Sequence, residues 1–129
     1  MITLLERYFE SGDERGRIEG LVACGEWREL NLITSRAGTV RGDHYHRSTR
    51  ELFVILDGEI RVVTQAVRDA TLVGPPSERV VGPGDVFIVE PEVNHVFHVT
   101  RDARWINALS ERMAPGAPDI LRVPRGAKP

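Results

Sequence analysis

Residues 38–58 read GTVRGDHYHRSTRELFVILDG and carry most of the information about the fold. The stretch contains five consecutive apolar residues, Leu52 to Leu56, and such a run is typical of a strand that is buried on both faces, inside a sandwich or barrel. Asp57 and Gly58 follow, and a second strand-like run extends from Glu59 to Val63, with Ile60, Val62 and Val63 as its apolar residues. Asp-Gly between two such runs predicts a hairpin, because a type I′ turn needs positive φ at both of its central positions.

Similar short apolar or alternating segments recur outward from this stretch in both directions. They lie at 17–23, 29–34, 86–89, 95–99 and 105–109. With 12 glycines and 8 prolines to form turns, about nine short strands at roughly ten-residue spacing indicate an all-β sandwich or barrel. One helical turn is expected over 4–9, and the Pro-rich tail, residues 113–129, cannot continue a sheet.

Composition narrows the class of protein. The 129 residues predict a single domain, 1–129, and a net charge of −2 argues against partners such as nucleic acid or a membrane surface. We find neither a spanning apolar run nor a signal-peptide pattern, so we expect a cytoplasmic protein. Because Cys24 is the only cysteine, any metal site must use His, Asp or Glu.

His44 and His46 are two residues apart, so on a strand their imidazoles point to the same face. Glu51 opens the buried strand, where a carboxylate needs a partner, and His95 follows a turn much later in the chain. Three imidazoles and one carboxylate would suit a divalent zinc, iron, manganese or nickel ion. An isolated His-x-His pair is more often a pair of surface histidines, so the interpretation depends on the combined spacing.

That spacing resembles the first motif of the cupin family, G-x5-H-x-H-x4-E-x6-G, at every specified position of residues 38–58. Residues 84–95 resemble the second motif, G-x5-P-x-G-x2-H, with Glu90 and Glu92 in place of its proline and glycine and Val99 in place of a final asparagine. The resemblance implies a single jelly-roll barrel of two antiparallel sheets. It also implies one metal ion inside, held by His44, His46, Glu51 and His95.

The segment RGDHYH at 41–46 resembles the sugar-nucleotide cupins, among them 3,4-ketoisomerases, 3,5-epimerases and the C-terminal domain of capsular-polysaccharide reductase/epimerase enzymes. The tail 107–119 is similar to the last of these. We therefore expect an epimerase or isomerase that acts next to the keto group of a nucleotide-linked sugar. Such chemistry needs a base for the proton and stabilisation of the enolate.

The base remains open at this point. In the metal-free ketoisomerases the two histidines of His-x-His resemble the acid and base, whereas in a metal cupin the ion occupies their lone pairs. His98, Tyr45, Asp43 and Glu92 are then the candidates by residue type, with His98 and Tyr45 as the catalytic predictions. Arg41 and Asp43 are the predicted substrate-binding residues, because an Arg there can bind a diphosphate in a bidentate manner.

Two other functions fit the same residues. One is an iron- or manganese-dependent dioxygenase acting on a small organic substrate, and the other is a non-catalytic, metal-stabilised sugar-binding module. A homodimer is expected, because exposed sheet edges are often covered by a partner strand and the N-terminal strand is suited to exchange.

Overall fold

The computed structural model describes residues 1–124, and these residues form strands and connections without any helix. This confirms the all-β prediction. Accordingly, the described residues contain no helix that is long and apolar enough to cross a membrane. The strands are β1 (Thr3–Leu4), β2 (Phe9–Asp13), β3 (Gly16–Gly20), β4 (Glu29–Ser35), β5 (Val40–His44), β6 (Glu51–Arg68), β7 (Thr71–Val81), β8 (Val86–Val89) and β9 (Val93–Leu109).

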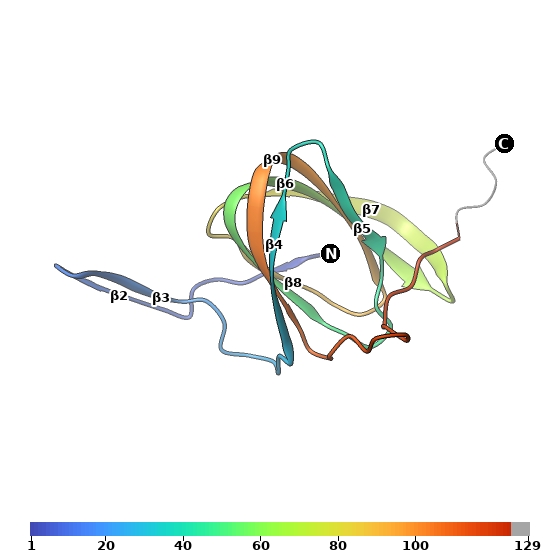
Figure 1. Ribbon diagram of the computed structural model, residues 1–129, viewed down its shortest axis with the longest axis horizontal. Coiled ribbons are helices and arrows are strands. Elements are labelled where there is room, and N and C mark those ends of the chain that lie inside the picture. Colours follow the sequence, from blue (N-terminus) through green and yellow to red (C-terminus); the bar gives the residue numbers. More distant parts are fainter. Residues whose placement is uncertain (125–129) are drawn as a thin grey trace.

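Two long strands, β6 and β9, form the frame of the barrel (Figure 1). They pair antiparallel along almost their whole length, and both bend in the middle. The first half of β6 lies between β8 and the second half of β9. The second half of β9 pairs on its other side with β4. The second half of β6 pairs with β7, and the first half of β9 pairs with β5. Each strand therefore contributes to two antiparallel sheets that face each other, as expected for a jelly roll.

The hairpin predicted at Asp57-Gly58 is wrong. The chain continues through these residues without a turn, as the single strand β6, with register shifts between Ile55 and Ile60. Gly58 has a φ of 92°, and a Cβ there would lie 2.4 Å from the carbonyl oxygen of Asp102 and 2.5 Å from Cα of Ala103. Asp-Gly therefore marks a bulge at the corner where β6 passes from one sheet to the other, because bulges need the same positive φ as a tight turn.

The helical turn expected over 4–9 is also wrong. Thr3 and Leu4 form the short edge strand β1, which pairs with Ile88 and Phe87 of β8. Beyond it, β2 and β3 form a separate two-stranded sheet, here called the arm, which projects away from the barrel (Figure 1). Glu14 and Arg15 form the tip of this arm, between the paired residues Asp13 and Gly16.

Alternation along the strands separates the interior of the barrel into two parts. Aromatic side chains fill one part, where the rings of Phe53 and Phe87 stack with centroids 5.0 Å apart and Phe97 lies between Phe53 and Trp105. All four side chains are buried. Two of the predicted metal ligands, Glu51 and His95, lie on the same inner face of β6 and β9 as Phe53 and Phe97, and the ring of His95 contacts both aromatic rings. The aromatic cluster therefore lies directly beside the predicted metal site.

The tail beyond β9 runs back along the barrel toward β5 (Figure 1). Leu121 forms an antiparallel bridge with Tyr45, through two backbone hydrogen bonds of 2.9 Å. The tail predicted from the sequence extends to residue 129, and residues 125–129 lie outside the described part.

Candidate metal centre

A β-bulge in β5 directs His44 into the barrel. Arg41 and Gly42 pair with Phe97 and Val96 of β9, but the register then shifts, so that His44 pairs with His95. Gly42 has a φ of 86°, and a Cβ there would lie 2.7 Å from the carbonyl oxygen of His95, which only glycine avoids. The chain thus brings two distant histidines to opposite positions on neighbouring strands.

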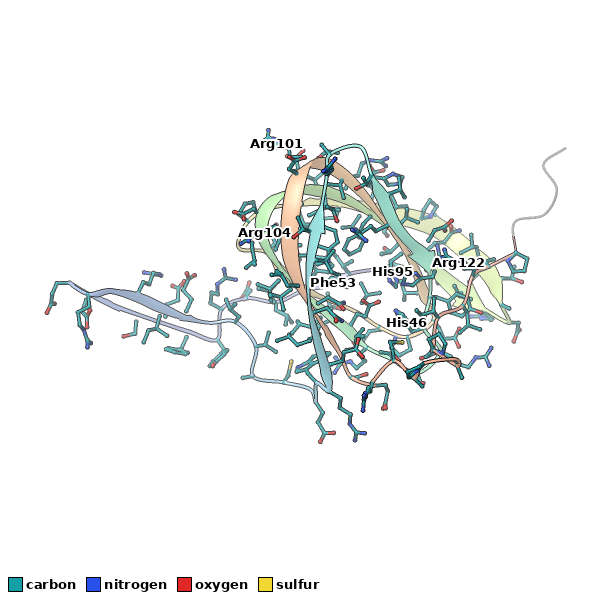
Figure 2. All side chains as sticks on the ribbon, viewed as in Figure 1. His46, Phe53, His95, Arg101, Arg104 and Arg122 are labelled. Atoms are coloured by element: carbon teal, nitrogen blue, oxygen red, sulfur yellow. The ribbon has the colours of Figure 1, made fainter. Side chains whose placement is uncertain are left out.

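Three imidazoles and one carboxylate converge at this point from β5, the loop after it, β6 and β9. The ligand atoms of His44, His46, Glu51 and His95 all lie within 4.8 Å of one another. Oε1 of Glu51 lies 3.0 Å from Nε2 of His95 and also accepts a short hydrogen bond from Nε2 of His46. The sequence analysis named these four residues, and Figure 2 shows His46 and His95 within the barrel near Phe53.

Burial and mutual contact shift the pKa values of these groups in different directions. Burial, helped by the neighbouring His95 and His46, lowers the pKa of His44 to about 4, so His44 is neutral at pH 7. Burial also lowers the pKa of His46, but the hydrogen bond and charge of Glu51 outweigh it and raise that pKa overall. Burial raises the pKa of Glu51, but hydrogen bonds from His46 and His95 hold it far below its ordinary value. The cluster therefore presents an ionised carboxylate and at least one neutral imidazole.

Hydrogen bonds from surrounding groups orient three of the four side chains. Nδ1 of His95 donates to the carbonyl oxygen of Val93 over 3.0 Å, and Nδ1 of His46 donates to the carbonyl oxygen of Asp119. Nδ2 of Asn107 donates to Oε2 of Glu51 over 2.6 Å. In proteins, metal-ligating histidines usually donate their second ring N–H in this way, which leaves Nε2 to face the ion.

The donor set fits a divalent first-row metal ion. Donors about 2.1 Å from a common ion lie roughly 3 to 4 Å apart, and the observed spread is close to this. Buried charge of this kind needs either an opposite charge or a metal. The four side chains can therefore hold one ion by three nitrogens and one oxygen.

The cluster lines a pocket of about 290 Å³, which is at the small end of the range for ligand sites. Its walls come from β4, β5, β6, β9 and the tail. Apolar side chains form most of the remaining lining: Ile33, Phe53, Phe97, Trp105, Leu109, Met113 and Ile120. Among the described residues of the lining, Arg41 is the single Arg or Lys and Glu29 the single carboxylate besides Glu51.

The two predicted substrate-binding residues have different positions. Arg41 lines the pocket, where its guanidinium donates to Oγ of Ser35 and, over 3.0 Å, to the carbonyl oxygen of Thr34. Asp43 occupies the bulge with a φ of 57° and accepts a hydrogen bond of 3.3 Å from Asn94, and it does not line the pocket. The structure thus brings Arg41, but not Asp43, to the cavity.

The structure does not bring the predicted catalytic residues into the pocket. His95 and Phe97 face inward on β9, whereas His98 has the opposite orientation on the strand and pairs with Val40. Tyr45 is buried and lies outside the pocket lining. Glu92, a further candidate by type, is absent from the lining as well.

The sequence analysis missed a chain of hydrogen-bonded polar side chains on one wall of the pocket. We call these residues, Glu29, Asn31 and Asn107, the polar ladder. Asn107 on β9 accepts from Asn31 on β4 over 3.2 Å, and Asn31 also donates to Glu29 over 3.0 Å. The backbone N–H of Met113 donates to the other oxygen of Glu29 over 3.1 Å. Alternation along 29–33 gave a signal, since Glu29, Asn31 and Ile33 share a face, but only the pairing of β4 with β9 places that face beside Glu51.

Comparisons with known proteins agree with this fold. Residues 31–109 match the family model described as Cupin domain, and the comparison with curated protein sequences gives no match. The fold is similar to QdtA, a sugar 3,4-ketoisomerase from Thermoanaerobacterium thermosaccharolyticum in complex with TDP, with a TM-score of 0.69 and 15% identity over 94% of this chain and 87% of that chain.

Two further solved structures are similar at comparable levels. For the dTDP-4-dehydrorhamnose 3,5-epimerase from Sulfolobus tokodaii the TM-score is 0.70, with 20% identity over 84% of this chain and 70% of that chain. For the capsular polysaccharide assembling protein CapF from Staphylococcus aureus it is 0.67, with 20% identity over 93% of this chain and 34% of that chain. At these identities the similarity shows the fold alone.

Proposed function

The chain belongs to the cupin family, and from this premise we propose that it is a metal-dependent enzyme that isomerises or epimerises a nucleotide-linked sugar next to a keto group. The observation that carries the proposal is the buried set of three histidines and one glutamate at the base of a pocket. The similar structures support the class of substrate, since they include a sugar 3,4-ketoisomerase and a 3,5-epimerase.

His44, His46, Glu51 and His95 would hold the metal ion. Bound there, a divalent ion supplies a Lewis acid that polarises the keto oxygen and stabilises the enolate that forms when the neighbouring proton leaves. Four protein ligands leave two positions open on an octahedral ion, which is enough room for a carbonyl oxygen.

The chain itself supplies the walls, the charge and the base. The apolar lining would pack against the sugar carbons, and Arg41 would provide a cation for the diphosphate. For the proton we propose Glu29, a carboxylate of the lining that no ligand role requires. Hydrogen bonds from Asn31 and from the Met113 backbone lower its pKa, so Glu29 is deprotonated at neutral pH. Release of those hydrogen bonds when substrate enters would raise its affinity for a proton.

A second candidate function has one observation in its favour. The pocket is small and mostly apolar, and within the described lining it offers a single permanent cation. This favours a small organic substrate, as for an iron- or manganese-dependent dioxygenase with the same ligand set. A metal-stabilised sugar-binding module without catalysis has the same site and differs only in the absence of turnover.

We also propose that two copies of the chain form a dimer through the arm. The arm exposes apolar side chains, Phe9 and Ile18 among them, and a two-stranded hairpin is only marginally stable without further packing. A second copy would supply that packing.

Elemental analysis of the purified chain tests the metal centre, with His44→Ala as the ligand variant and His98→Ala as the control outside the pocket. One equivalent of metal in the wild type and the control, lost in His44→Ala, is the expected result. Metal that persists in His44→Ala contradicts the ligand set. Metal that is absent throughout contradicts the metal centre and returns His44 and His46 to the roles of acid and base.

Incubation with nucleotide-linked 4-keto sugars in D2O then tests the reaction. Deuterium incorporation next to the carbonyl, retained in His98→Ala and strongly reduced in Glu29→Gln, is the expected outcome. Oxygen consumption by the iron-loaded chain with a small organic substrate, without deuterium exchange, would instead support the dioxygenase.

A further inference from the structure

The described part of the tail forms one side of the metal pocket and is fixed at both ends. We call residues 113–122 the strap. At its start, the backbone N–H of Met113 donates to Glu29 on β4. At its end, Leu121 bridges to Tyr45, and Arg122 donates to the carbonyl oxygens of Gly42 and Asp43 over 2.9 and 3.0 Å. Figure 2 shows Arg122 on this segment beside the barrel. Met113 and Ile120 of the strap line the pocket.

The carboxylate of Asp119 anchors the strap to the loop between two metal ligands, His46 and Glu51. It accepts backbone N–H bonds from Arg47, Ser48 and Thr49, at 2.8, 2.9 and 3.0 Å. The hydroxyl groups of Thr49 and Ser48 add bonds of 2.8 and 3.2 Å. Five donors for one carboxylate far exceed what a surface aspartate normally finds, and they lower the pKa of Asp119 to about 2 against the opposing effect of burial.

The backbone of the same residue touches the metal cluster directly. The carbonyl oxygen of Asp119 accepts the Nδ1–H of His46. This contact fixes the proton on Nδ1 and turns Nε2 toward Glu51, where the ion would bind. The side chain of Asp119 holds the loop, and its main chain holds the imidazole, so one residue sets both the position and the tautomer of His46.

We propose that Asp119 is a positioning residue of the metal centre, and that metal occupancy in turn holds the strap closed over the pocket. The proposal rests on the proposed metal-binding function. Its two halves are linked, because a strap that strengthens metal binding must itself be stabilised by the metal to the same extent. The strap thereby couples loading of the site to closure of the wall that Met113 and Ile120 provide.

Metal affinity of the metal-free chain tests the first half, measured with Zn²⁺ against a chromophoric chelator. Asp119→Ala should weaken Zn²⁺ binding by about 10- to 100-fold, the usual effect of losing an outer partner of a ligand. Asp119→Asn, which keeps one acceptor oxygen, should recover part of this loss. The matched control is Asp102→Ala: Asp102 also accepts a backbone N–H, from Ala37 over 2.8 Å, but lies outside the pocket lining. Equal affinity of Asp119→Ala and the wild type would overturn the proposal.

Limited trypsin digestion of the wild-type chain tests the second half without any variant. Arg112 and Arg122, just before and at the end of the strap, are exposed, and so are Arg15 and Arg17 of the arm. Zn²⁺ should slow cleavage after Arg112 and Arg122 several-fold and leave cleavage in the arm unchanged. Equal protection of both regions, or of neither, in a chain that retains Zn²⁺ would overturn the coupling. A wild-type chain that binds neither Zn²⁺ nor Co²⁺ would instead overturn the proposed metal centre itself.

Discussion

Asn107 donates a hydrogen bond to one carboxylate oxygen of Glu51, and His46 and His95 contact the other. Its Nδ2 donates to Oε2 of Glu51 over 2.6 Å, and Oε1 faces Nε2 of both His46 and His95. Both side chains are buried, with relative exposures of 6% for Glu51 and 5% for Asn107. The amide therefore restricts Glu51 to a single oxygen for a metal ion and leaves further positions on that ion to a substrate.

Asn107→Ala should damage the site in two measurable ways. The buried oxygen of Glu51 loses its donor, so the free energy of unfolding of the metal-free chain should fall by about 1–3 kcal/mol in urea. Zn²⁺ affinity should fall by roughly 10- to 100-fold. Asn31→Ala, which removes the next member of the ladder and leaves Glu51 its donor, should have a smaller effect on Zn²⁺. A larger loss in Asn31→Ala would show that the ladder does not act through Glu51.

Metal binding should strengthen as the pH rises from 6 to 8. His46 has a pKa raised above its ordinary 6.5, so it carries a proton over part of this range and must release it to bind a metal. His44, with a pKa of about 4, and Glu51, with a lowered pKa, are already deprotonated and add nothing to the slope. Calorimetry in two buffers of different ionisation enthalpy should show release of up to about one proton per ion. Affinity that is independent of pH would contradict this assignment.

Arg41→Ala should separate substrate binding from metal binding. Arg41 lies on the pocket wall and donates hydrogen bonds to Ser35 and Thr34, neither of which is a predicted metal ligand, so its loss should leave the ligand cluster intact. Binding of a nucleoside diphosphate should weaken by about 10-fold or more, in line with the loss of a charged hydrogen bond, while metal content stays at the wild-type value. Arg36→Ala, an exposed arginine at the end of β4 and absent from the lining, is the control. Unchanged nucleotide binding in Arg41→Ala would remove this residue from the site.

Gly58→Ala should destabilise the barrel by about 2 kcal/mol or more, because the new Cβ would combine positive φ with contacts of 2.4–2.6 Å to Asp102 and Ala103. Gly74→Ala is the matched control: Gly74 also has a positive φ, of 69°, but open space around it, so roughly 1 kcal/mol is expected from the backbone alone. Urea unfolding of both variants checks the difference. Equal losses would show that the corner has room for a side chain.

The same glycine shows where sequence reasoning fails. Asp57-Gly58 predicts a tight turn because only the local need for positive φ is visible in the sequence. Whether that need serves a turn or a bulge depends on β9, which pairs on both sides of the bend and keeps β6 continuous. By contrast, the strand at Val86–Val89 was predicted with the correct bounds, because an apolar run between two turn motifs leaves no alternative.

The residues of the candidate site likewise fall into those that the sequence predicts and those that only the structure shows. His44, His46, Glu51 and His95 carry a spacing that is visible in the sequence, and the structure brings all four together. Asn107 and Asp119 carry none, and the alternation that puts Glu29 on one face with Asn31 and Ile33 does not show what that face meets. The contacts of these residues depend on the register of β4 against β9 and on the return of the tail across 70 residues, and no local pattern encodes either.

The arm provides the last prediction, which concerns self-association. It pairs with no other strand of the described chain, and Ile18 is 64% exposed. On the barrel, the edge strand β4 exposes Leu30 and Leu32 on its outer face, at 69% and 58%. We expect the arm of each copy to cover this face of the other. In a dimer with twofold symmetry this contact occurs twice, so one substitution in the chain removes two contacts from each dimer.

Light scattering should therefore give twice the 14.4 kDa of one chain. Ile18→Glu should weaken the dimer by at least 10- to 100-fold, since burial of one such side chain contributes about 1.5–3 kcal/mol. Val80→Glu is the matched control, because Val80 on β7 is similarly exposed, at 57%, and lies on the other sheet. A wild-type chain that stays monomeric at high concentration, or equal dissociation of both variants, would contradict the arm as the contact.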